Sequence, residues 1–225
     1  MAIEHMVMPQ VSGKKEGDFY FGDFPCAIVT TDTSSVPFSI TVDFGSGCTN
    51  ANGDFFAGLL IIQLSSDNFN AQVGNYQRIT FTNLITTTDT VSGDALFTYT
   101  GLNGSGNPTM SLVSNLTTAG KWDEIRFNGT NNLAIEFALD TVGGANNTVQ
   151  YFTGSGIGTV NGQSYTQTIT QALNYSEQCE DHFVSGELKV EIPAQADRFI
   201  DYGPGACDDR ATITQSGVTT NITLQ

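Results

Sequence analysis

The residues best suited to chemistry lie in two similar glycine-rich segments, one near each end of the chain. The first runs Asp43-Phe-Gly-Ser-Gly-Cys48, and the second runs Asp201-Tyr-Gly-Pro-Gly-Ala-Cys207. Each sets a carboxylate, an aromatic ring and a cysteine on backbone that glycine allows to turn sharply. The chemistry open to these residue types is disulfide formation by the cysteines and cation binding by the acids.

The four cysteines form two spaced pairs, and no CxxC motif accompanies them. A structural zinc site needs Cys or His ligands at short spacing, so disulfides are the better interpretation. We favour Cys26–Cys48 and Cys179–Cys207, because each pair then belongs to one copy of the repeated segment, and the other pairings stay open. Disulfides indicate an oxidising compartment, so we expect a location outside the cytoplasm.

The oxygen-bearing side chains around both segments make calcium a candidate ligand, since Ca²⁺ takes about six to eight oxygen ligands. An EF-hand is excluded, because Cys48 and Leu59 stand where its first Asp and closing Glu belong. The favoured alternative is that Asp43 and Asp201 accept hydrogen bonds from their own loops as Asx-turns. The candidate calcium ligands are Asp43, Asn50, Asn52, Asp54, Asp201, Asp208 and Asp209.

No catalytic constellation accompanies these segments, and we predict that the protein is not an enzyme. The chain has two histidines, and neither stands in a recognisable nucleophile–base pattern. A flat aromatic platform for sugar rings is a second possibility, with ordinary packing within the core as its alternative. The candidate platform residues are Trp122, Tyr99, Tyr151 and Tyr165.

Charge and composition limit the partners. The 225 residues include 23 Asp and Glu but 8 Lys and Arg, for a net charge of −15. The electrostatic field of this negative charge repels phosphate backbones and anionic lipid, so nucleic acid is not an expected partner.

No apolar run reaches the length of a transmembrane helix. The first residues lack the pattern of a signal peptide, so we expect a mature form without its leader.

The surrounding sequence predicts an all-β fold. The segment from Tyr76 to Asn83 alternates, with Ile79 and Phe81 on one face and Tyr76, Arg78, Thr80 and Thr82 on the other. Glycines 154, 156 and 158 have the wrong spacing for a phosphate loop and indicate a strand edge or bulge. We predict an antiparallel β-sandwich of many short strands, with two packed half-repeats as one form of it. Residues 1–22 are expected to be a flexible lead-in or an added segment, and 23–225 a single domain whose half-units, about 23–100 and 170–225, echo each other.

The cysteine segments resemble those of secreted or outer-surface lipoprotein-type β domains of Bacteroidetes. The resemblance rests on Cys26-Ala-Ile-Val-Thr30, Ile40–Thr49 and Ile200–Ile213, and extends over residues 26–224. It implies export and an extracellular or outer-membrane surface location, often through a lipid anchor on an N-terminal cysteine that this chain lacks. It carries over no catalytic residue. These domains often have an arginine after the Asn-Gly turn, where this chain has Asp54-Phe-Phe56.

Together these features predict a non-enzymatic, surface-exposed interaction, adhesion or accessory lipoprotein-like domain. Its expected partner is another surface protein or a second copy, taken up by strand addition at the edge of a sheet. A carbohydrate-binding module, with a glycan as ligand, is the alternative. No cofactor is expected other than calcium, which is a candidate ligand of the two glycine-rich segments.

Overall fold

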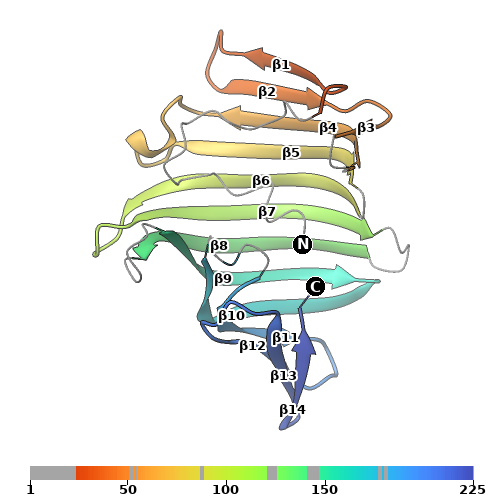
Figure 1. The fold of residues 1–225 in the computed structure, drawn as a ribbon, viewed down its shortest axis with the longest axis vertical. Coiled ribbons are helices and arrows are strands. Elements are labelled where there is room, and N and C mark those ends of the chain that lie inside the picture. The colour runs from red at the N-terminus through yellow and green to blue at the C-terminus, as the bar shows by residue number, and fades with distance from the viewer. Residues whose placement is uncertain are drawn as a thin grey trace. The chain divides into compact units, whose positions relative to one another are not determined.

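The computed structural model describes residues 24–50, 53, 55–86, 89–120, 126–140, 147–176, 179 and 182–224 (Figure 1). Their regular elements are antiparallel strands and one short 3-10 turn, η2 (Phe69–Ala71). The strands are β1 (Ile28–Asp32), β2 (Phe38–Asp43), β3 (Cys48–Thr49), β4 (Phe55–Leu64), β5 (Tyr76–Ile85), β6 (Asp89–Leu102), β7 (Pro108–Gly120), β8 (Arg126–Asp140), β9 (Asn147–Val160), β10 (Gln163–Ser176), β11 (Ser185–Glu191), β12 (Arg198–Pro204), β13 (Arg210–Gln215) and β14 (Val218–Thr223). The predicted all-β, antiparallel class is confirmed, and no helix of the described residues could span a membrane.

The strand order follows the chain, from β1 through β2 and β4 to β14, with β3 paired beside β4. This single continuous order differs from the two sheets of the sandwich that we expected. Each strand pairs with the strands that lie next to it along this path rather than with one that is distant in the sequence. Asn161-Gly162 and Ser216-Gly217 are two-residue turns with positive φ at both positions, which matches the right-handed twist of the flanking strands.

The chain divides into two compact units. The first holds residues 1–99 and 113–129, and the second holds residues 100–112 and 130–225. Each unit therefore contains one of the two glycine-cysteine segments.

The core of the first unit is built from rows of apolar side chains that run across neighbouring strands. Ile79 and Phe81 of β5 share its buried face, as the alternating sequence predicted. Residues that face one another in the register bury the same face of the sheet, so each row excludes water along its length. One row is Ile40, Ile62, Ile79 and Ala95, and the next is Val42, Leu60 and Phe81.

Glycines interrupt the ladders at four strand positions where two backbones approach too closely for a side chain. Gly58, Gly93, Gly154 and Gly186 all have positive φ. A Cβ at any of them would overlap a carbonyl oxygen of the neighbouring strand. The pairing register shifts beside these positions, so they are β-bulges. The bulge expected near glycine 154 is confirmed.

Replacing Gly93 by alanine should therefore destabilise the fold. The new methyl group would collide with the Asn115 carbonyl oxygen of β7, and alanine disfavours the φ of +118° at this position. We expect a loss of about 2–4 kcal/mol in the free energy of unfolding, measured by urea denaturation.

Gly104→Ala is the matched control, because a Cβ there meets open space. It should change the free energy of unfolding by less than about 0.5 kcal/mol. Equal effects of the two substitutions would contradict the bulge assignment.

Candidate functional site

The two glycine-cysteine segments are closed by disulfides. Cys26 bonds Cys48 and Cys179 bonds Cys207, each with a Cα–Cα distance of 5.5 Å. Both favoured pairings are confirmed. Each bridge contributes about 3 kcal/mol on the loop-entropy model. We call Asp43–Cys48 with Cys26 the first corner, and Asp201–Cys207 with Cys179 the second corner.

The first corner folds back on β4 through its backbone. The Gly45 N–H donates to Asp43 Oδ1 at 2.7 Å, which makes an Asx-turn. The Phe44 N–H donates to the Gly58 carbonyl at 2.9 Å, and the Gly58 N–H donates to the Gly45 carbonyl at 3.0 Å. The bulge at Gly58 thus lets the corner lie against β4.

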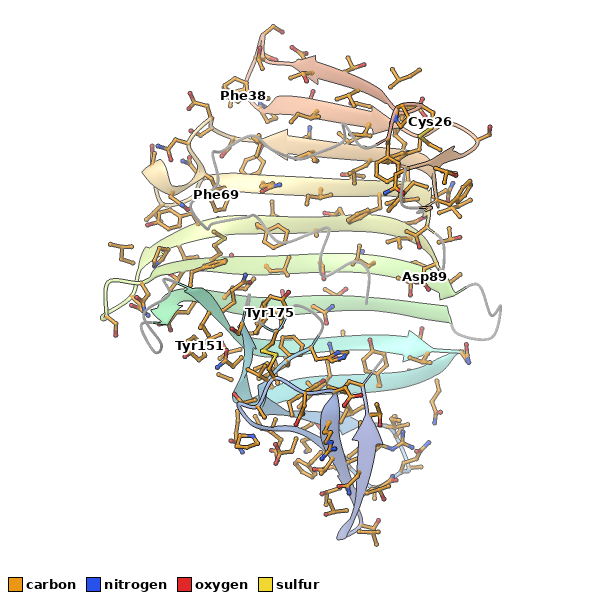
Figure 2. All side chains as sticks on the ribbon, in the orientation of Figure 1. Cys26, Phe38, Phe69, Asp89, Tyr151 and Tyr175 are labelled. Atoms are coloured by element: carbon orange, nitrogen blue, oxygen red, sulfur yellow. A yellow bond between two sulfur atoms is a disulfide. The ribbon has the colours of Figure 1, made fainter. Side chains whose placement is uncertain are left out.

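Aromatic rings pack under this corner. Phe44 stacks on Phe56 with centroids 5.3 Å apart, and Phe24 meets Phe56 edge-on at 4.9 Å. Figure 2 labels Cys26, which lies two residues after Phe24 and joins this group to the disulfide. Ring packing and the disulfide together hold the start of β1 against the end of β2.

The second corner repeats this design in the other unit. The Gly203 N–H donates to Asp201 Oδ1 at 2.8 Å, and the Gly205 N–H donates to the Val184 carbonyl at 2.9 Å. Tyr202, the counterpart of Phe44, meets Phe183 edge-on at 5.4 Å. The repeated sequence therefore specifies a repeated local structure.

The acids of the corners are used by their own loops. Asp43 and Asp201 form the Asx-turns described above, which confirms that interpretation of both. Asp208 Oδ1 accepts the Arg210 N–H at 3.0 Å. Asp209 is exposed, and its backbone carbonyl, rather than its carboxylate, accepts the Leu224 N–H at 2.7 Å. Asn50 has interactions of its own.

Asn52 and Asp54 lie outside the described residues. Within the described ranges, no group of three or more His, Cys, Asp or Glu side chains could hold a metal ion. The geometry accordingly favours loop closure over chelation.

The candidate aromatic platform is divided between the interior and the surface. Tyr99 and Tyr165 are 7% and 9% exposed, so their rings belong to the packed interior. Burial raises the pKa of Tyr165 to about 12. Tyr151, labelled in Figure 2, is half-buried, and Trp122 lies outside the described residues. Tyr99 and Tyr165 are therefore too buried to form part of an exposed platform.

The free edges of the sheet are the remaining candidate site. The strand order begins at β1 and ends at β14, so the outer edge of each has no partner strand among the described residues (Figure 1). The sequence predicted that edge strands exist but could not identify them. The apolar side chains there are exposed: Ile28 by 67%, Val29 by 46% and Val218 by 66%.

Backbone hydrogen bonds fix which amides of β1 face outward. In an antiparallel ladder, successive residues bond alternately to the strands on either side. The Phe44 N–H points to β4, so Thr41 and Asp43 of β2 bond to β1, where their partners are Thr30 and Ile28. The N–H and C=O groups of Val29 and Thr31 therefore point away from β2 at the free edge.

The same reasoning applies to β14. The Leu224 N–H bonds the Asp209 carbonyl, so Ile222 and Thr220 exchange hydrogen bonds with β13. The backbone groups of Thr219, Asn221 and Thr223 consequently point outward. No residue of β14 is charged.

The one charged residue of β1 is Asp32, at its end. Its carboxylate accepts the Ser34 hydroxyl at 2.6 Å and the Ser34 N–H at 2.9 Å, which lowers its pKa. This charge is thus directed into the turn that follows β1.

No protein-family model matches this chain, and neither a curated protein nor a solved structure is significantly similar to it.

Calcium should leave the protein unchanged. Asp43 and Asp201 each use one carboxylate oxygen to close an Asx-turn, and no group of three or more His, Cys, Asp or Glu side chains gathers around them in the described ranges. We expect no heat on titrating CaCl₂ into chelator-treated protein, and the same melting temperature with calcium or with EDTA. A saturable heat that disappears in Asp43→Ala but persists in Asp67→Ala would show that the corner binds calcium.

Proposed function

We propose that this protein is a non-enzymatic interaction domain that works outside the cytoplasm and takes up a protein partner by strand addition at its free sheet edges. One observation carries the proposal. The outward backbone groups of Val29 and Thr31 on β1, and of Asn221 on β14, have no strand beside them in the described part of the chain. Added strands gain affinity from such main-chain groups.

The composition of these strands supports the same role. Proteins commonly protect an edge strand with lysine, proline or a bulge, because an open edge invites pairing with other chains. Neither β1 nor β14 contains lysine or proline. The register of each with its neighbour runs without a shift. Two edge strands that lack these protective features suit a protein that binds a partner at the edges of its sheet.

The covalent chemistry supports a location outside the cytoplasm. Two disulfides close the corners, and such bonds persist in oxidising compartments. The resemblance of the corner sequences to outer-surface lipoprotein-type domains supports a place at a cell surface. The net charge of −15 disfavours nucleic acid as the partner.

The proposal is tested by binding to the outer-surface protein fraction of the producing cells, followed by biolayer interferometry. Wild-type protein should bind. Thr31→Pro and Asn221→Pro each remove an outward N–H without removing a bond to the neighbouring strand. We expect at least one of them to weaken binding about tenfold or more, and a glycan array to give no signal.

Thr31→Val and Asn221→Ser are the matched controls, because both keep the amide, and both should bind as the wild type does. Circular dichroism melts establish that every variant is folded. Unchanged binding by both proline variants would contradict strand addition. Glycan binding that is lost in Tyr151→Ala would favour the carbohydrate-binding alternative.

A further inference from the structure

We infer that the strand added to β1 is β14 of a second copy of this chain, so that the protein forms head-to-tail oligomers. The inference rests on the proposed function and names its partner. Each copy offers one β1 edge and one β14 edge. Pairing one with the other is heterologous, so every added copy leaves a β1 edge and a β14 edge for the next.

The outward backbone groups of the two strands match in register. An antiparallel alignment that sets Thr31 opposite Thr219 also sets Val29 opposite Asn221. All four of these residues direct their N–H and C=O groups outward, as the ladders within each unit establish. Each pair would exchange two backbone hydrogen bonds.

The side chains match in the same alignment. Thr30 faces Thr220, and Ile28 faces Ile222, so like residues meet on one face. Threonine pairs of this kind already occur in the sheet. Thr214 and Thr219 face each other between β13 and β14 with hydroxyl oxygens 2.9 Å apart. The proposed contact therefore extends a pairing that the protein uses within itself.

Pairing of identical edges is the competing arrangement, and the experiment below distinguishes it. Two β1 strands that align their outward amides set the apolar Ile28 against the carboxylate of Asp32. Two β14 strands can align their outward amides in two registers, of which one sets Thr220 against Ile222 and the other sets Thr220 against itself and Val218 against Ile222. Such symmetric contacts would also close as dimers and leave the other edge open. In the β1–β14 pairing, Thr30 faces Thr220 and Ile28 faces Ile222, although Asp32 then faces Val218. The carboxylate of Asp32 is held in its own turn by Ser34.

Charge determines where copies can meet. With a net charge of −15, two copies repel each other over most of their surfaces. The uncharged β14 and the nearly uncharged β1 are exceptions. Because salt screens the general repulsion and leaves backbone hydrogen bonds in place, association should strengthen as sodium chloride is added.

Two single substitutions test the inference by analytical ultracentrifugation of the full chain. Thr31→Pro blocks the β1 edge and Asn221→Pro blocks the β14 edge. Wild-type protein should form oligomers whose mean size rises with concentration and with salt. Each variant alone should be monomeric. An equimolar mixture should form dimers and nothing larger, because each blocked copy retains the edge that the other lacks.

Other outcomes overturn the inference. Wild-type protein that stays monomeric over the whole concentration range contradicts it. Dimers of Asn221→Pro alone would indicate β1–β1 pairing, and dimers of Thr31→Pro alone would indicate β14–β14 pairing. If a proline variant fails to fold, as judged by circular dichroism, Thr31→Lys and Asn221→Lys replace the pair, because a lysine charge blocks an edge and keeps the amide.

The proposed function and this inference fail separately. If wild-type protein is monomeric but Thr31→Pro or Asn221→Pro still weakens binding to the surface-protein fraction, self-pairing is wrong and strand addition stands. If neither property responds to either substitution, both are wrong.

Discussion

The structure depends on the requirement that backbone N–H and C=O groups find partners. An antiparallel ladder satisfies this requirement for a strand only when a neighbour lies on each side. In the order from β1 to β14, each strand between these two on the path has both neighbours, and within the part of the chain that the structure describes β1 and β14 have one each. The same rule that stabilises the interior of the sheet thus leaves two open edges, where we place the function.

The two corners hold the ends of strands in place where the chain turns. Each combines an Asx-turn from Asp43 or Asp201, a group of packed rings and a disulfide. A glycine bulge at Gly58 or Gly186 lies on the adjacent strand, where a side chain would meet a carbonyl oxygen. These devices are local and mutually supporting, so the same short sequence builds the same corner in both units.

Local features of this kind could be predicted from the sequence. The spacing of the cysteines predicted the disulfides, and the Asp-aromatic-Gly motif predicted the Asx-turns. The alternation of apolar and polar residues predicted the buried face with Ile79 and Phe81. Features set by distant residues could not. The burial of Tyr99 depends on residues distant in the sequence, such as Phe69 of η2, whose ring centroid lies 6.3 Å from that of Tyr99. The amides of β1 and β14 resemble those of interior strands until the strand order is known.

The central claim is that the outer edge of β1 presents free backbone groups in alternation. Residue-resolved amide hydrogen exchange by NMR on dilute, disulfide-intact protein tests it most directly. We predict slow exchange at Thr30, which bonds β2, and fast exchange at Val29 and Thr31 on either side of it. Equal protection at all three amides would mean that the edge is already covered, and would contradict the account.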